Sequence, residues 1–305
     1  MAFTAKDVQA LREKTGVGMM ECKKALVETD GDMDKAIDIL RERGLASSAK
    51  KASRVAAEGV VVAYNDKANK VGVLVEVNCE TDFVAKNPKF VELANNVAKT
   101  VAEKNPADLD ALLKTEISGG TGTVEEAVQE LFLAIRENMK VRRFVRTEGV
   151  VETYIHAGGS VGVMVEFDTD DATAAKDEFV VAGKDVAMQV AAMSPSYLDI
   201  ASVPAEVVEH EKGILLAQMK EDPKMANKPE AVLAKIVDGK IAKFYKENCL
   251  VEQAFVKDGD LTVAKYVEKA LGGAAKVKGF TRFQRGEGIE KKADNFAEEI
   301  ANMVK

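Results

Sequence analysis

An internal repeat is the feature that most constrains how this chain can fold. Residues 58–64 recur with few changes as residues 148–154, and residues 71–76 recur as residues 161–166, both at an offset of 90 residues. Across residues 58–77, 10 positions are identical to those of the later copy. Self-similarity at a fixed spacing is typical of a supersecondary unit that is used more than once. The chain is therefore expected to contain two related structural units.

A third matching segment shows that the two copies differ in length. Arg143-Phe-x-Arg-x-Glu-Gly149 returns as Arg282-Phe-x-Arg-x-Glu-Gly288, at an offset of 139 residues. The two offsets differ by 49 residues, so the second copy carries an insertion of that size. Its expected place is about residues 199–247.

The repeated segments predict strands, and the residues between them predict helices. Residues 59–64 and 71–77 are rich in Val and flank a polar turn, which is typical of a β-hairpin. Phe90, Leu93 and Val97 then follow at helical spacing. Each unit is predicted to be β-β-α(α)-β, with helices on one face of a small antiparallel sheet. The predicted fold class is α+β.

The first 54 residues predict a separate domain of three short helices. Thr4 to Asp7 resembles a capping box that begins a helix, and Asp32 can cap the third helix. Gly44 stands where a C-terminal glycine cap belongs, so the third helix is expected to end there.

The insertion predicts an antiparallel hairpin of two amphipathic helices, joined by a loop that contains Pro223 and Pro229. Such an arm either projects and contacts a partner or a second copy, or folds flat onto the core. The complete predicted division is as follows: residues 1–54, N-terminal three-helix domain and tether; 55–147, core unit one; 148–198 and 248–288, core unit two; 199–247, helical hairpin; 289–305, C-terminal helical module.

Composition argues against several classes of function. The chain has 43 Lys and Arg against 50 Asp and Glu, a net charge of −7, whereas a general nucleic-acid binder usually has a basic excess. Three widely spaced cysteines and two histidines suit neither a disulfide framework nor a metal site. The sequence has neither a membrane-length apolar run nor a signal-peptide pattern. We therefore expect a cytoplasmic protein without a metal, a nucleic-acid partner or a membrane partner.

The loop after the second strand is the first candidate site. Copy one reads Thr81-Asp82-Phe83-Val84 where copy two reads Asp171-Ala172-Thr173-Ala174, so only copy one has the pair Asp-Phe. A loop that serves only the scaffold has no need of this pair in one copy alone. Phe83 is expected either to insert into a partner, with Asp82 accepting a hydrogen bond beside it, or to tuck under its own helix.

The second candidate site lies in the N-terminal domain. Gly16 and Gly18 permit a tight backbone that could approach a partner closely, but the Gly-Lys-Ser/Thr of a phosphate-binding loop is missing. Met19 and Met20 offer an adaptable apolar surface, and Lys23 suits an acidic partner. The alternative is that the methionines fill the core and the lysine is simply solvated.

Two enzymatic alternatives remain open. Asp168, Asp170 and Asp171 follow an apolar strand and resemble the site of phosphatases that use an aspartate nucleophile and magnesium. Cys79 with His156 is a conceivable nucleophile pair, although a buried structural cysteine is the more common case. His156 lies in a turn between two strands, which favours a contact residue over a ligand.

Three segments together resemble the elongation factor Ts family. Residues 11–26 (LREKTGVGMMECKKAL) are similar to its N-terminal signature, and residues 76–86 (EVNCETDFVAK) are similar to its second signature. Residues 280–292 are similar to its C-terminal pattern. The resemblance covers essentially the whole chain in the family's order, and both leading motifs are long and specific.

This resemblance implies a function that is not enzymatic, namely guanine-nucleotide exchange on elongation factor Tu. It implies that the N-terminal domain is ubiquitin-associated-like. The GTPase would bind GDP, GTP and magnesium, so this chain would need no cofactor, and the hairpin could support a homodimer. The residues expected to contact the GTPase are Thr81, Asp82, Phe83, Val84, Met19, Met20, Lys23 and His156, together with the module at 289–305.

Overall fold

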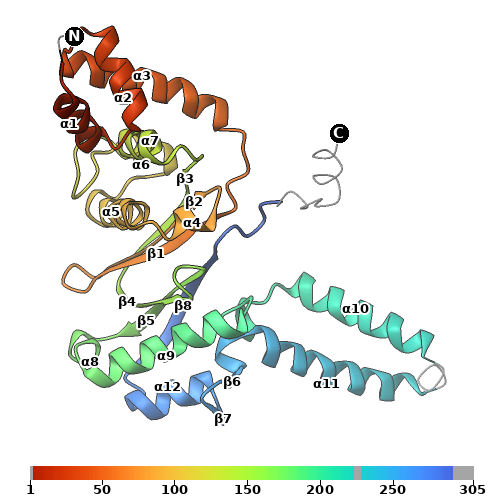
Figure 1. Cartoon of the computed structure of the whole chain (residues 1–305). Helices are drawn as coiled ribbons and strands as arrows, with labels where there is room; N and C mark the ends of the chain where they lie inside the picture. The colour runs from red at the N-terminus through yellow and green to blue at the C-terminus, as the bar shows by residue number, and fades with distance from the viewer. Residues whose placement is uncertain (1–2, 223–227, 291–305) are drawn as a thin grey trace.

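The computed structural model describes residues 3–222 and 228–290, which begin with three packed helices (Figure 1). These helices are α1 (Ala5–Thr15), α2 (Met19–Glu28) and α3 (Met33–Lys51). The Asp7 carboxylate accepts a hydrogen bond from the Thr4 N–H at 2.6 Å, so the predicted start of α1 is confirmed. Buried Leu11, Leu26 and Leu40 form the centre of the cluster that joins the three helices.

The predicted end of the third helix at Gly44 is wrong, because α3 continues to Lys51. A Cβ on Gly44 would lie 1.8 Å from Cδ2 of Leu133, which belongs to helix α7 (Val124–Ile135). Leu133 is itself part of the buried cluster of the N-terminal helices. Gly44 therefore lets α7 approach α3 closely, rather than ending α3.

The first core unit is an antiparallel sheet with helices packed on it. The sheet has the order β1 (Glu58–Asp66), β2 (Val71–Cys79), β3 (Lys140–Glu148). Its helices are α4 (Asp82–Ala85), α5 (Pro88–Lys104), α6 (Leu109–Leu113) and α7. Apolar side chains of α5, including Phe90, Leu93 and Val97, are buried against the valines of β1 and β2. This burial explains why the alternating valines and the helical pattern occur together.

The second core unit has the same strand order. Its sheet is β4 (Val150–His156), β5 (Val161–Thr169), β8 (Ala275–Gln284), and its helices are α8 (Asp171–Ala174), α9 (Asp177–Met193) and α12 (Val263–Leu271). In both units the pairing between the second and third strands shifts register at the same repeat position, after Glu76 and after Glu166. The repeat is thus present in the ladder of backbone hydrogen bonds as well as in the sequence.

The two sheets contact each other through a small, pseudo-symmetric apolar cluster. A Cβ on Gly72 would lie 2.4 Å from Cγ2 of Val151, and a Cβ on Gly162 would lie 2.4 Å from Cγ1 of Val61. These pairs are repeat equivalents, since Gly72 and Gly162, and Val61 and Val151, are 90 residues apart. Glycine is needed at both places because each valine occupies the space of the missing side chain.

The insertion forms an antiparallel pair of helices that projects from the body of the molecule (Figure 1). Between α9 and the hairpin lies the short 3₁₀ helix η1 (Ile200–Ser202). The hairpin helices α10 (Ala205–Glu221) and α11 (Glu230–Asn248) have a small core of their own around Met219, Val237 and Ile241. After them come η2 (Leu250–Glu252) and a ribbon of β6 (Ala254–Phe255) and β7 (Asp258–Thr262).

At the level of fold class, helices with small antiparallel sheets confirm the α+β prediction. In the part of the chain that the structure describes, no helix is both long enough and apolar enough to cross a membrane. Of the predicted C-terminal module, residues 289–305, all but residues 289 and 290 lie outside the described residues.

Candidate partner-binding site

The short helix α4 holds Phe83 in solvent. Thr81 begins the helix by accepting a hydrogen bond from the Val84 N–H, and the side chains of Val84 and Ala85 are buried in the first core unit. Phe83 points away from that core and is 82% exposed. The alternative in which Phe83 tucks under its own helix is therefore wrong.

The backbone that carries Phe83 is braced from several sides. Glu137 accepts hydrogen bonds from both the Thr81 N–H at 3.0 Å and the Thr81 hydroxyl at 2.7 Å. The Cys79 thiol donates to the Thr81 carbonyl at 3.2 Å, and the Glu80 carboxylate accepts from the Asn138 N–H at 2.6 Å. These bonds fix the start of α4, so Phe83 is presented on a rigid base.

The structure refines the comparison between the two copies of this loop. In copy two the helix cap is Asp170, one residue earlier than an offset of 90 from Thr81 predicts. Copy one thus has one extra residue between strand and helix, and Phe83 corresponds to the exposed Ala172. The aspartate before it recurs as Asp171, so the phenylalanine alone is unique to copy one.

The neighbours of Phe83 differ in exposure. Asp82 is partly exposed and forms an ion pair with Lys86 at 2.6 Å; the hydrogen bond from Lys86 lowers the pKa of the Asp82 carboxyl. Val84 is only 8% exposed, and Thr81 is partly buried as the helix cap. Asp82 and Phe83 can reach a partner directly, whereas Thr81 and Val84 anchor the helix.

The N-terminal candidate residues also lie on the surface. Met19 and Met20 are exposed in the first turn of α2, and Lys23 is exposed in the next turn, while Cys22 is buried. Of the two glycines, Gly16 lies close to another part of the same chain, since a Cβ placed there would lie 2.9 Å from the Cβ of Ala134. Gly18 has open space around it.

His156 is exposed at the end of β4, where its Nδ1 lies 3.1 Å from the Tyr154 hydroxyl. Its turn is attached to the first sheet, because the Val61 N–H donates to the Gly159 carbonyl at 2.7 Å. Helix α4 contacts β1 as well. The His156 turn and the Phe83 helix thus both contact β1, while α2 lies among the N-terminal helices (Figure 1).

Two of the three aspartates of the phosphatase alternative have structural roles. Asp170 caps α8 by accepting from the Thr173 N–H at 2.7 Å, a bond that also lowers the pKa of its carboxyl. Asp171 pairs with Lys70 of the first core unit at 2.5 Å. Asp168 is an exposed residue of β5. Among the described residues, no cluster of three or more His, Cys, Asp or Glu is arranged to hold a metal ion.

Cys79 is poorly suited to act as a nucleophile. Its side chain is fully buried, and burial, together with the negative charge of Glu137, raises the pKa of the thiol to about 12. The thiolate is the reactive form, so a thiol that stays protonated at neutral pH is inert.

Sequence reasoning missed the residues that brace the candidate site. Glu80 and Glu137 hold the loop, and a buried network around Glu76 holds the third strand. A signal was available for Glu76, because it is a glutamate inside an otherwise apolar strand. Nothing local distinguishes Glu137 from the other acidic residues near the end of α7.

An exposed apolar side chain on a braced loop, in an α+β scaffold of two repeated units, is typical of a protein that binds a protein partner. The comparisons with known proteins place it more narrowly. The model of the family described as "Elongation factor TS" matches residues 80–287, more than half of the chain. The chain belongs to the elongation factor Ts family, a family of translation elongation factors.

Curated relatives are similar along the whole chain. An elongation factor Ts of Clostridium perfringens (strain ATCC 13124) is 50% identical, with 99% of each chain covered. Those of Clostridium novyi (strain NT) and Clostridium botulinum (strain Eklund 17B) are 47% and 46% identical, covering 99% of this chain and 98% and 99% of their own.

Proposed function

We propose that this chain binds elongation factor Tu with GDP bound and promotes release of the GDP, so that GTP can be loaded. Exchange would occur because the factor disturbs the site where the GTPase holds magnesium and phosphate. GDP, GTP and magnesium would be bound by the GTPase, and this chain would act in the cytoplasm without a cofactor of its own.

The observation that carries the proposal is the exposure of Phe83. A solvated aromatic ring on a rigid helix start costs free energy that burial in a partner would recover, about 1.5–3 kcal/mol. The second repeat copy, which has an equivalent helix after a loop one residue shorter, has Ala172 at this position. The scaffold thus does not require the ring, which supports a role in binding.

A large acceleration of GDP release requires more than one contact with the GTPase. Moving a two-state equilibrium by 10⁴-fold takes roughly 5.5 kcal/mol of differential binding. One phenylalanine provides less than that, so other surfaces must bind the same partner conformation. Met19, Met20, Lys23 and His156 are exposed and available for this. Factor and nucleotide would then weaken each other reciprocally, as linkage requires.

Replacing Phe83 by alanine tests the proposal. Phe83→Ala should slow factor-stimulated release of a fluorescent GDP analogue from elongation factor Tu by at least about tenfold, because the ring's burial free energy is lost. Stability should change little, since the ring makes few contacts in the free protein. Stopped-flow fluorescence measures the release rate, and thermal unfolding measures the stability.

Ala172→Phe is the matched control, because it places the same ring on the equivalent helix of the second copy. It should leave the release rate unchanged. A Phe83→Ala variant that releases GDP as fast as the unmodified factor would refute the role of Phe83. An unmodified factor that does not accelerate release at all would refute the exchange function itself.

A further inference from the structure

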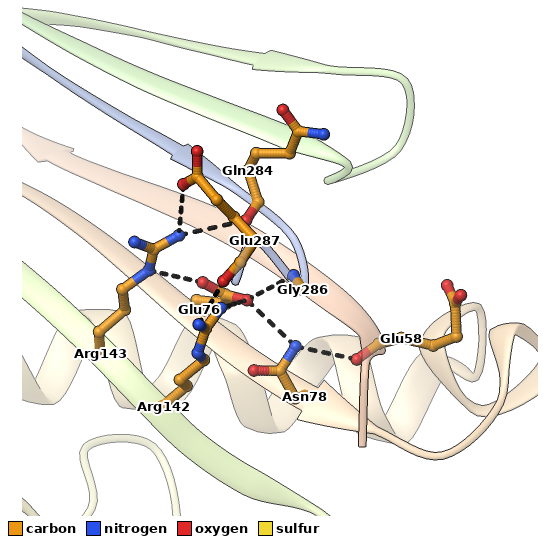
Figure 2. A network of polar contacts seen from close by, with 8 residues as sticks. All are labelled: Glu58, Glu76, Asn78, Arg142, Arg143, Gln284, Gly286 and Glu287. Atoms are coloured by element: carbon orange, nitrogen blue, oxygen red, sulfur yellow. Dashed lines mark hydrogen bonds and ion pairs between the residues drawn. The ribbon is translucent and has the colours of Figure 1, made fainter. Parts of the chain in front are cut away.

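A fully buried glutamate connects the two core units (Figure 2). Glu76 of β2 accepts hydrogen bonds from Arg143 Nε at 2.6 Å, Arg142 Nη1 at 3.0 Å and Asn78 Nδ2 at 3.1 Å. A fourth bond comes from the backbone N–H of Gly286 at 2.8 Å. Gly286 follows β8 of the second unit, so this one carboxylate joins β2 and β3 of the first unit to the second unit.

The equivalent glutamate of the other copy has no such environment. Glu166 is 26% exposed in its side chain and has Lys278 at 3.9 Å as its ion-pair partner. The two glutamates occupy the same repeat position, before the same shift in strand pairing. The scaffold therefore does not demand a buried, fully bonded carboxylate here, and the network at Glu76 is a specific addition.

The chain leaves the second sheet where the two copies differ in sequence. Gly286 corresponds to Thr147, which continues strand β3, whereas β8 ends at Gln284. Gly286 has φ of +70°, and a Cβ there would lie 2.3 Å from the Ala57 carbonyl oxygen. Only glycine allows the chain to turn toward Glu76 at this point.

A continuous path of hydrogen bonds leads from Glu76 to the His156 turn. Next to Gly286, the Arg285 N–H donates to the Ser160 carbonyl at 2.9 Å. The Ser160 N–H in turn donates to the His156 carbonyl at 3.1 Å. In the other direction, Glu76 lies on β2, whose end leads directly into the loop that carries Phe83.

Other directional contacts also join the two units. The Val61 N–H donates to the Gly159 carbonyl at 2.7 Å, and Asn65 Nδ2 donates to the Val151 carbonyl at 2.9 Å. The contacts between the two sheets also include apolar pairs, which fix the relative position of the sheets less strictly. The pairs Gly72–Val151 and Gly162–Val61 are apolar and non-directional. Charge-assisted hydrogen bonds, by contrast, specify direction as well as distance.

We infer that Glu76 is a positioning residue for the partner-binding surface. By holding Gly286, it acts together with the Val61–Gly159 hydrogen bond to fix the His156 turn relative to the Phe83 helix, so that both side chains engage one partner at the same time. This role rests on the proposed exchange function.

The geometric part can be tested without the partner. Spin labels on the full chain at Lys89→Cys in the first unit and Lys184→Cys in the second occupy exposed helix positions, whereas the native cysteines are buried. We expect one narrow distance distribution in the unmodified background and with Glu166→Gln, the matched control. Glu76→Gln should broaden it.

Gly286→Ala provides a second way to disrupt the hydrogen bond between Gly286 and Glu76, because it displaces the loop without changing the carboxylate. It should broaden the distance distribution in the same way. It also takes the place of Glu76→Gln if that variant does not fold.

The functional part is a double-mutant cycle in the GDP-release assay. Glu76→Gln should slow release by about tenfold, since small displacements of a binding group have large effects on rate. His156→Ala should then cost much less in this background than in the unmodified one, because the turn is already misplaced. A general loss of folded protein would leave the cost of His156→Ala the same in both.

Either of two results would overturn the inference. One is a Glu76→Gln distance distribution as narrow as that of Glu166→Gln. The other is an equal cost of His156→Ala in both backgrounds. If the unmodified factor fails to accelerate GDP release, the exchange function fails, and the distance measurements alone then decide whether Glu76 positions the turn.

Discussion

At the scale of single residues, the fully buried carboxylate of Glu76 needs hydrogen-bond partners in order to stay charged. Removing a charge from water is costly unless hydrogen bonds compensate for it. Burial raises the pKa of Glu76, but the bonds from Gly286, Arg143, Arg142 and Asn78 outweigh this and lower the pKa below its ordinary value. The folded protein thus binds this proton less tightly than the unfolded chain.

The direction of this shift predicts a pH dependence of stability. The contribution of Glu76 is complete above the unfolded-state pKa of about 4.3 and is lost as the pH falls through the lower folded-state pKa. Glu76→Gln should therefore reduce the free energy of unfolding by roughly 1–3 kcal/mol at pH 7. The difference from the unmodified protein should shrink below about pH 4.

Urea unfolding at a series of pH values, followed by circular dichroism, measures this difference. Glu166→Gln is the control, because its carboxylate is partly exposed and has one distant ion-pair partner. A gap between Glu76→Gln and the unmodified protein that stays constant from pH 7 to pH 3 would contradict the prediction.

At the scale of elements, local sequence patterns predicted where helices begin better than where they end. Thr4 and Asp32 both cap helices, as their residue types indicate. The local pattern predicts the wrong role for Gly44, because the role of a glycine inside a helix depends on what packs against it. Leu133, which fills the space beside Gly44, lies far away in sequence, so no local pattern could reveal the contact.

Two helical glycines should respond to alanine in opposite directions. Gly239 in α11 is exposed and has open space around it, so Gly239→Ala should stabilise α11 by about 0.5–1 kcal/mol through lower entropy of the unfolded chain. Gly44→Ala should instead weaken the packing of α3 on α7, because the new methyl group collides with Leu133.

Hydrogen exchange of the backbone amides in α3 and α11 distinguishes the two effects. Protection in α11 should increase with Gly239→Ala, and protection in α3 should decrease with Gly44→Ala. Increased protection of α3 in Gly44→Ala would show that the helix ends accommodate the methyl group and that Gly44 is not needed for the contact.

At the scale of the whole molecule, the repeat in the sequence predicted two sheets of like topology and an inserted hairpin. How the sheets are joined was not predictable, since it depends on contacts such as Glu76 to Gly286, which are 210 residues apart. The site was predictable to a similar extent. Phe83 and His156 could be selected as exposed residues, but their attachment to one strand is visible only in the folded chain.

The projecting hairpin carries the last prediction, homodimerisation. Ile214, Leu216 and Val232 are exposed on the hairpin, outside its own small core. In a two-fold dimer formed through the hairpin, Val232 would be buried against the second copy, so Val232→Lys would bury an unpaired charge and raise the dimer Kd at least about tenfold. Analytical ultracentrifugation over a range of concentrations measures the Kd. Val181→Lys, on the exposed surface of α9, is the control and should leave the Kd unchanged. An unmodified chain that stays monomeric at every concentration would mean that these side chains are covered by another partner or remain in solvent.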